Sequence, residues 1–291
     1  MKDILGYEGK TCVVLGCAHG MGKEGVKILK DLGAYVIGMD IDFVDCVPCD
    51  EFIQVDLASK ASVDAAFSKL GSFDKFFAYA AVSGWKNTKT ETFSINFLSY
   101  KYFLETYVFE KINRGGGAIG LVSSVAGTNW WKYSYEYKPV MDMSWEEGLA
   151  FIQAREDDIS PANAYQLSKR ALIYYATSQA TELYAKKQAR INLVAPTYTH
   201  TRLRGEFSAY GAWNTEGEVM ALQGSVPRDC EPEEQANALI FLCSNMATGI
   251  NNLNLPVDNG LRGLQLAGLH LDCTDCEYIV PGSGKNLATL S

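Results

Sequence analysis

A tyrosine and a lysine four residues apart are the side chains in this sequence best suited to chemistry. The segment Tyr165-Gln-Leu-Ser-Lys169 places both on one face of a helix, because residues i and i+4 are neighbours there. A phenol with a reference pKa of about 10 is a poor base near neutral pH. A nearby ammonium group favours the phenolate and lowers that pKa, so Tyr165 could exchange a proton with a substrate oxygen.

Two further polar residues could complete a proton-transfer site. Ser124 follows the apolar run Ala118–Ser123, where its hydroxyl could hold a substrate oxygen against Tyr165. Asn96 lies inside an expected helix and could hold a water molecule for proton relay. Each also has a structural alternative, because strand-end serines often cap and interior asparagines can simply bridge backbone groups. Their order after a glycine-rich turn favours the catalytic interpretation.

That turn is Gly16-Cys-Ala-His-Gly20-Met-Gly22, between the apolar run Thr11–Leu15 and the helical pattern Gly20–Leu32. Glycines let the backbone turn tightly and approach a pyrophosphate, whose charge is then stabilised by the helix N-terminus. A P-loop is excluded because Glu24 stands where that motif requires Ser or Thr. A glycine-rich turn without a ligand is the structural alternative.

Asp40 ends the next expected strand, Tyr35–Met39, at about the 20-residue offset typical of a dinucleotide fingerprint. A carboxylate there accepts hydrogen bonds from ribose hydroxyls and repels a 2′-phosphate. Ile41 and Asp42 supply no cation to offset that repulsion. The sequence therefore predicts NAD as cofactor, with a solvated strand-end acid as the alternative role for Asp40.

Strand and helix patterns alternate along the chain, which indicates an α/β fold with a parallel sheet covered on both faces. We predict a single doubly wound Rossmann domain over residues 1–291, with a central parallel sheet of about seven strands. Further strands are expected at Phe52–Val55, Phe73–Ala80, Ala118–Ser123, Arg190–Ala195 and Leu253–Val257, and helices at Lys60–Leu70, Phe93–Asn113, Asn163–Ala185 and Pro232–Ser244. Three segments interrupt the alternation: an insertion over 128–162, a substrate lid over 197–230 and a C-terminal tail over 261–291.

Charge and composition exclude several classes of partner. A net charge of −8 disfavours nucleic acid, whose binders concentrate Lys and Arg in a patch. The N-terminal segment lacks an apolar signal core, and no stretch reaches the roughly 18 apolar residues of a membrane span. The eight cysteines are spread without a dense framework, which suits a reducing compartment. We therefore expect a cytoplasmic protein with no membrane partner.

Two C-x2-C pairs, Cys46/Cys49 and Cys273/Cys276, have the spacing of a four-cysteine zinc site. In a sheet ordered 3-2-1-4-5-6-7 these segments leave opposite edges, so one subunit does not easily join them. The histidines are too scattered to form a site of their own: His19, His200 and His270. No metal is expected, and the cysteines are expected to be free thiols.

An aromatic run follows Ser124 in the sequence. It contains Trp130, Trp131, Tyr133, Tyr135 and Tyr137. Aromatic residues more often pack in the core, but this run could equally line a large apolar substrate pocket. Trp130, Trp131 and Tyr198 are the predicted substrate-binding residues.

Together these motifs resemble those of the short-chain dehydrogenase/reductase family. The residues that carry the resemblance are Gly16, Gly20, Gly22, Asp40, Asn96, Ser124, Tyr165 and Lys169. It extends from about Lys10 to Gly260, and the segments LGCAHGMG, IGMDID and ARINLVAPTYTHT are most similar to the bacterial 3α-hydroxysteroid dehydrogenase/carbonyl reductase branch. The resemblance implies a homodimer or homotetramer.

The resemblance also implies roles for individual residues. Asn96, Ser124, Tyr165 and Lys169 are the implied catalytic set. Beyond the glycines and Asp40, the implied cofactor contacts are His19, Met21, Asp56, Leu57, Ala80, Lys169, Pro196, Thr199 and Thr201. Among these, Asp56 is implied to bind the adenine and Thr201 the nicotinamide carboxamide.

The expected function is reversible hydride transfer between NAD(H) and a secondary alcohol or ketone on a bulky apolar substrate, such as a steroid or bile acid. One alternative is a general carbonyl reductase or alcohol dehydrogenase that acts on another lipid or small carbonyl. A second is a regulator that senses NAD and has lost turnover. The presence of all four catalytic residues disfavours the regulator.

Overall fold

A computed structural model describes residues 3–210 and 223–270 of the chain. Part of the expected lid, most of the expected tail, and Cys273 and Cys276 lie outside the described residues.

Seven parallel strands form one sheet in the order β3-β2-β1-β4-β5-β6-β7. Their bounds are β1 Thr11–Leu15, β2 Tyr35–Asp40, β3 Glu51–Gln54, β4 Lys75–Ala78, β5 Ala118–Val122, β6 Arg190–Pro196 and β7 Asn254–Val257. This confirms the predicted doubly wound fold and its strand order. The order reverses between β1 and β4, and in such sheets ligands bind in the crevice at the carboxyl ends of the strands flanking that reversal.

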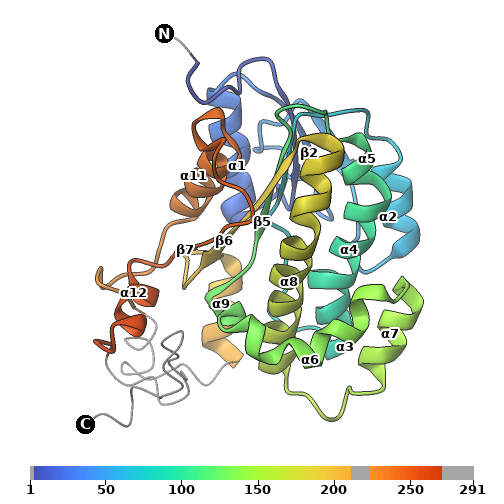
Figure 1. Cartoon of the computed structure of the whole chain (residues 1–291), viewed down its shortest axis with the longest axis vertical. Helices are drawn as coiled ribbons and strands as arrows, with labels where there is room; N and C mark the ends of the chain where they lie inside the picture. Colours follow the sequence, from blue (N-terminus) through green and yellow to red (C-terminus); the bar gives the residue numbers. More distant parts are fainter. Residues whose placement is uncertain (1–2, 211–222, 271–291) are drawn as a thin grey trace.

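Helices cover both faces of the sheet, as a parallel sheet requires. On one face lie α1 (Gly20–Asp31) and α11 (Pro232–Cys243), and on the other lie α2 (Lys60–Phe67), α4 (Ser99–Phe103), α5 (Phe109–Lys111) and α8 (Pro161–Lys187) (Figure 1). Every residue of β4, β5 and β6 is buried. The central strands are therefore held rigidly between two helical layers.

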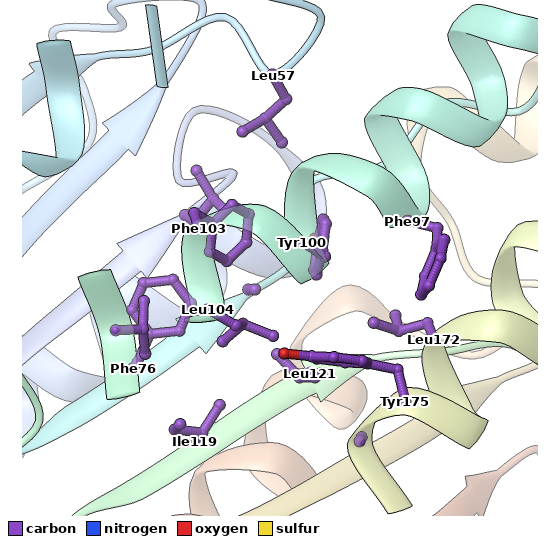
Figure 2. Packing of buried hydrophobic residues seen from close by; sticks show 14 of the residues in the cluster. Leu57, Phe76, Phe97, Tyr100, Phe103, Leu104, Ile119, Leu121, Leu172 and Tyr175 are labelled. Atoms are coloured by element: carbon purple, nitrogen blue, oxygen red, sulfur yellow. The ribbon is translucent and has the colours of Figure 1, made fainter. Parts of the chain in front are cut away.

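Aromatic and aliphatic side chains fill the space between the sheet and the second helical layer. Figure 2 shows Phe76 of β4, Ile119 and Leu121 of β5, Tyr100 and Phe103 of α4, and Leu172 and Tyr175 of α8. The rings of Phe67 and Phe103 stack with centroids 4.7 Å apart. This packing fixes α8, the helix that carries Tyr165 and Lys169, against the sheet.

The helical segment from residue 89 to residue 111 contains two π-helical turns. It runs through α3 (Lys89–Phe93), the π-helix η1 (Ser94–Leu98), α4, a second π-helix η2 (Leu104–Val108) and α5. A helix was predicted here from Phe93, but it begins four residues earlier because Thr88 and Glu91 form a capping box. Asn96 lies in the first π-turn, a type of turn found frequently at functional sites.

The insertion over 128–162 contains several short helices. After the 3-10 turn η3 (Val125–Gly127) come η4 (Trp130–Tyr133), α6 (Ser134–Tyr137), η5 (Lys138–Asp142) and α7 (Trp145–Gln153). α6 packs against α8, and α7 packs against α3 and η1. The sequence contained a signal for α7, because Ser144 and Glu147 form a capping box at its start.

Two helices lie within the segments predicted as lid and tail. α9 (Arg202–Tyr210) follows β6 and α12 (Leu261–Leu266) follows β7, while η6 (Asn245–Ala247) precedes β7. Figure 1 shows α6, α9 and α12 at the lower end of the molecule, where β5, β6 and β7 end. In the described part of the chain, no helix has the length and apolar character needed to cross a membrane.

Glu156 joins the end of the insertion to the start of α3. Its carboxylate accepts hydrogen bonds from the backbone amides of Lys89 and Thr90 at 2.9 and 2.8 Å, two amides that a helix N-terminus otherwise leaves unpaired. We expect Glu156→Ala to lower the free energy of unfolding by about 1–2 kcal/mol. Urea denaturation measures this, with the exposed neighbour Asp157→Ala as control. Equal losses in the two variants would contradict a capping role for Glu156.

Candidate active site

Three of the four predicted catalytic residues meet at the carboxyl end of β5. Tyr165 and Lys169 are 8% and 2% exposed, on the α8 face toward the sheet. The Lys169 Nζ atom lies 5.7 Å from the centre of the Tyr165 ring and donates a hydrogen bond to the Val122 carbonyl at 3.0 Å. The Ser124 hydroxyl interacts with the Tyr165 phenol in the direction that lowers its pKa. These side chains therefore form one polar site in an otherwise apolar surrounding.

Burial controls the protonation of this pair. It raises the pKa of Tyr165 to about 12, although the interaction with Ser124 acts in the opposite direction. It also lowers the pKa of Lys169 to about 7. The sequence predicted that the lysine lowers the pKa of the phenol, whereas in this structure burial raises it, because a low-dielectric surrounding disfavours the charged form of both groups.

Asn96 contacts backbone groups rather than an open space. Its Oδ1 atom accepts a hydrogen bond from the Val82 amide and its Nδ2 atom donates to the Val82 carbonyl, both at 2.9 Å. Nδ2 also donates to the Ser168 hydroxyl at 3.3 Å, which in turn donates to the Tyr165 carbonyl at 2.7 Å. Asn96 thus links the loop after β4 to the helix that carries Tyr165, which is the bridging alternative considered for it.

The glycine-rich turn leaves no room for larger side chains. Gly16 has a φ of +83°, and a Cβ atom there would lie 2.5 Å from the Ala80 amide nitrogen. A Cβ atom on Gly22 would lie 1.9 Å from the Gly16 carbonyl oxygen. The turn is therefore packed directly against the residues after β4, at the reversal of strand order, and its shape fits close approach of a pyrophosphate.

A cavity of about 510 Å³ adjoins this turn. Many of the predicted cofactor residues line it: Gly16, His19, Gly20, Met21, Gly22, Asp40, Asp56, Leu57, Ala80 and Thr201. The Asp40 carboxylate accepts hydrogen bonds from the Ala18 and Asp42 amides at 2.8 and 3.2 Å, so it is fixed at the cavity wall. The residues present fit a dinucleotide.

A second cavity, of about 340 Å³, opens on Ser124 and Tyr165. Pro196, Thr199, Thr201 and Lys169 line it too, and it shares Met21 and Thr201 with the first cavity. Phe207 of α9 packs edge-on against the Tyr165 ring, with centroids 5.2 Å apart. The part of the predicted lid that the structure describes therefore covers the ring of Tyr165.

The prediction that Trp130 and Trp131 wall the substrate cavity is wrong. Neither lines it: Trp130 packs against Tyr174 of α8 at 6.1 Å, and Trp131 is 49% exposed. The chain turns at Asn129, which has a φ of 60°, just before the two tryptophans. Tyr198 does line the cavity, as predicted. Tyr133, which belongs to the aromatic run considered for this role, lines it as well, and the aromatic residues that were missed are Tyr79, Trp85 and Phe207.

The cysteine pair in the loop after β2 shows no metal site. The Lys23 ammonium donates a hydrogen bond to the Cys46 sulfur at 3.1 Å, and both Cys46 and Cys49 are free thiols. Across residues 3–210 and 223–270, no three histidine, cysteine or acidic side chains gather as metal ligands.

Comparisons with known proteins agree with this geometry. Residues 149–262 match the family model described as Enoyl-(Acyl carrier protein) reductase. Over 255 residues the chain is 31% identical to the coniferyl-alcohol dehydrogenase of Pseudomonas sp. (strain HR199), and the alignment covers 87% of this chain and 96% of that relative. The chain belongs to the short-chain dehydrogenase/reductase family. It is therefore an oxidoreductase, as the motifs predicted.

Other short-chain dehydrogenases/reductases are similar at lower identity. The 7α-hydroxysteroid dehydrogenase of Escherichia coli (strain K12) is 25% identical, with 89% of this chain and 96% of that relative covered. The crystal structure of a 3α-hydroxysteroid dehydrogenase from Pseudomonas sp. B-0831 complexed with NADH superposes with a TM-score of 0.74 at 22% identity, covering 88% of this chain and 98% of that chain. The fold is thus shared among short-chain dehydrogenases/reductases whose names give different substrates.

Proposed function

We propose that this short-chain dehydrogenase/reductase transfers hydride between NAD(H) and a secondary alcohol or ketone on a bulky, ring-containing apolar substrate such as a steroid. The observation that carries the proposal is that Ser124 and Tyr165 together line a cavity with aromatic walls beside the glycine-rich turn. Asp40, with no basic residue at the next two positions, supports NAD rather than NADP.

Different residues bind the substrate oxygen and transfer the proton. A bound nicotinamide supplies or accepts the hydride. Ser124 holds the substrate oxygen, and Tyr165 takes the proton from an alcohol or returns it to a ketone. Lys169 uses one donor on the Val122 carbonyl and has others for the nicotinamide ribose. Asn96 positions the helix that carries Tyr165.

A primary aromatic alcohol is the second candidate substrate. The coniferyl-alcohol dehydrogenase that is 31% identical to this chain favours it. Aromatic walls accept a single substituted ring as well as a fused ring system, and the same proton transfer serves both.

A substrate panel tests the proposal by the change in NADH absorbance. Each additional 100 Å² of apolar surface buried adds about 2.5 kcal/mol, so a steroid should have a far higher kcat/KM than a short-chain alcohol. Trp85→Ala should lower kcat/KM for the steroid, whereas Trp131→Ala, outside the cavity, should not. A preference for aromatic alcohols over steroids would select the second candidate, and equal efficiency on all three classes would contradict both.

The pH dependence should differ between the two directions of the reaction. With a Tyr165 pKa of about 12, the phenolate fraction rises about tenfold per pH unit below that value. Alcohol oxidation should therefore rise between about pH 6 and pH 9, whereas ketone reduction, which needs the protonated phenol, should not rise over the same range. Measuring kcat/KM in both directions checks this. If kcat/KM for alcohol oxidation reached a plateau below pH 9, the pKa of Tyr165 during the reaction would be lower than about 12.

A further inference from the structure

The loop between β2 and β3 carries a pair of cysteines that hydride transfer does not use. The segment Cys46-Val-Pro-Cys49 has the C-x2-C spacing and lies within the βαβ pattern at the start of the chain. That combination is typical of a redox-active pair of thiols. Both cysteines are free thiols in the structure, so the pair is present in its reduced form.

The two thiols lie in different surroundings. Cys46 is exposed, and the ammonium group of Lys23 on α1 donates a hydrogen bond to its sulfur at 3.1 Å. Cys49 is half-buried, and burial raises the pKa of its thiol. Reactive cysteines are typically accessible and lie beside a cationic group, whereas buried thiols react slowly. Cys46 is therefore the thiol that meets an oxidant first, and Cys49 is the neighbour that can react with it next.

Cys49 packs against β2 beside the glycine-rich turn. A Cβ atom on Gly38 of β2 would lie 2.9 Å from the sulfur of Cys17 and 3.1 Å from the sulfur of Cys49. The two sulfurs are therefore at most about 6 Å apart, and Cys17 follows Gly16 in the turn. Cys17 is buried, and burial is the main reason that the pKa of its thiol is raised to about 12. It is thus an unreactive neighbour that marks how close Cys49 lies to the cofactor site.

The same loop holds residues of the cofactor cavity in place. Asp40 and Ile41 line that cavity, as does His19. The Asp42 amide donates to the Asp40 carboxylate at 3.2 Å, and the Asp42 carboxylate lies 3.8 Å from His19. Asp42 precedes Cys46 by only four residues. A rearrangement of the loop at Cys46 therefore reaches the contacts that fix Asp40 and His19.

We propose that hydrogen peroxide converts Cys46 and Cys49 into a reversible disulfide, and that this disulfide weakens binding of the dinucleotide. The inference goes beyond the proposed function and does not depend on the substrate. A disulfide draws the two sulfurs to about 2.05 Å, so both side chains must shift. A disulfide sulfur carries no charge and is a poor partner for the Lys23 ammonium. The loop thereby loses a contact with α1, and Asp42 no longer fixes Asp40 as before.

The oxidation takes two steps. The Cys46 thiolate attacks a peroxide oxygen, so that an S–O bond forms, the O–O bond breaks and hydroxide leaves, which gives a sulfenic acid. The Cys49 sulfur then attacks the Cys46 sulfur, so that the S–S bond forms and the S–O bond breaks, and the oxygen leaves as water with the Cys49 proton. The thiols give up two electrons, which reduce hydrogen peroxide to water. Dithiothreitol returns them by thiol–disulfide exchange.

The test uses the full chain before and after hydrogen peroxide. Peptide mapping by mass spectrometry should find Cys46 joined to Cys49. The Kd for NADH, measured by fluorescence titration, should rise at least about fivefold, as is typical of coupled sites, and dithiothreitol should restore it. Neither measurement needs a substrate, so the result is separate from the fate of the proposed function. Two intact thiols, or a bond between Cys49 and Cys17, would overturn the disulfide. An unchanged Kd would overturn its link to the cofactor.

Three variants assign the effect to this loop. Cys49→Ser should form no disulfide and keep its NADH affinity after peroxide, with dimedone trapping the sulfenic acid on Cys46. Lys23→Met should slow formation of the disulfide without changing which cysteines pair. Cys273→Ser is the matched control, because it breaks the second C-x2-C pair of the chain, and it should respond as wild type does. A full response in Cys49→Ser, or none in Cys273→Ser, would contradict the assignment.

A second measurement uses the reciprocity of coupled sites. If the disulfide weakens NADH binding by a given factor, saturating NADH must disfavour the disulfide by the same factor. In a glutathione redox buffer, NADH should therefore raise the ratio of dithiol to disulfide at Cys46 and Cys49 at least about fivefold. A ratio that NADH does not change would show that the loop and the cofactor site are uncoupled.

Discussion

Replacing Tyr165 with phenylalanine should lower kcat by roughly 10²-fold or more, because the change removes the oxygen that transfers the proton. The ring and its contact with Phe207 are retained, so packing at the site should change little. NADH affinity, measured by fluorescence titration, should stay near that of the wild-type protein. A normal affinity combined with a collapsed rate would assign Tyr165 to the chemical step.

Tyr174→Phe is the control for this experiment. Tyr174 lies on the same helix, α8, but packs against Trp130 and Tyr137 outside the cavity. Its loss of a hydroxyl should leave kcat almost unchanged. Full activity in Tyr165→Phe would remove Tyr165 from the mechanism, and equal losses in both variants would indicate a general effect on α8.

Replacing Asp40 with alanine should reduce the preference for NADH over NADPH by at least about tenfold. The carboxylate is fixed at the cofactor cavity by the Ala18 amide, where it favours ribose hydroxyls and repels a 2′-phosphate. The change should appear mainly in the Michaelis constants for the two cofactors. Steady-state kinetics with each cofactor at one fixed substrate concentration measures it.

Asp42→Ala separates position from charge in that experiment. Asp42 carries the same charge two residues later, but its carboxylate faces His19 at 3.8 Å and it does not line the cofactor cavity. We expect its cofactor preference to stay close to wild type. Faster turnover of NADPH than NADH by the wild-type protein at equal concentrations would overturn this interpretation of Asp40.

Local sequence patterns predicted the features that depend on interactions between residues close together in the sequence. The strands were visible as apolar runs, and the glycine-rich turn was visible because its conformation excludes side chains. Gly22 shows why, since a Cβ atom there would overlap the Gly16 carbonyl. The i, i+4 spacing of Tyr165 and Lys169 predicted one helix face, and the structure places both residues there.

The features that were missed depend on contacts between distant segments. The aromatic run after Ser124 has no period that distinguishes cavity from core, and the turn at Asn129 decides which rings face the site. Asn96 contacts Val82 from a π-turn, a conformation that residue propensities do not signal. The arginines that line the cavity were also missed, because Arg170 and Arg262 are 92 residues apart in the sequence.

The first π-turn also matters for sequence alignment of this chain with other proteins. A π-turn closes hydrogen bonds between residues i and i+5, whereas an α-helix closes them between i and i+4. The turn η1 therefore contains one residue more than a regular α-helical turn. Each helical residue turns the side-chain direction by about 100°. A relative with a regular α-helix here therefore aligns correctly only with a single-residue gap between Ser94 and Leu98. An ungapped alignment pairs Asn96 with a residue that points elsewhere, so a missing asparagine there is no sign of lost activity.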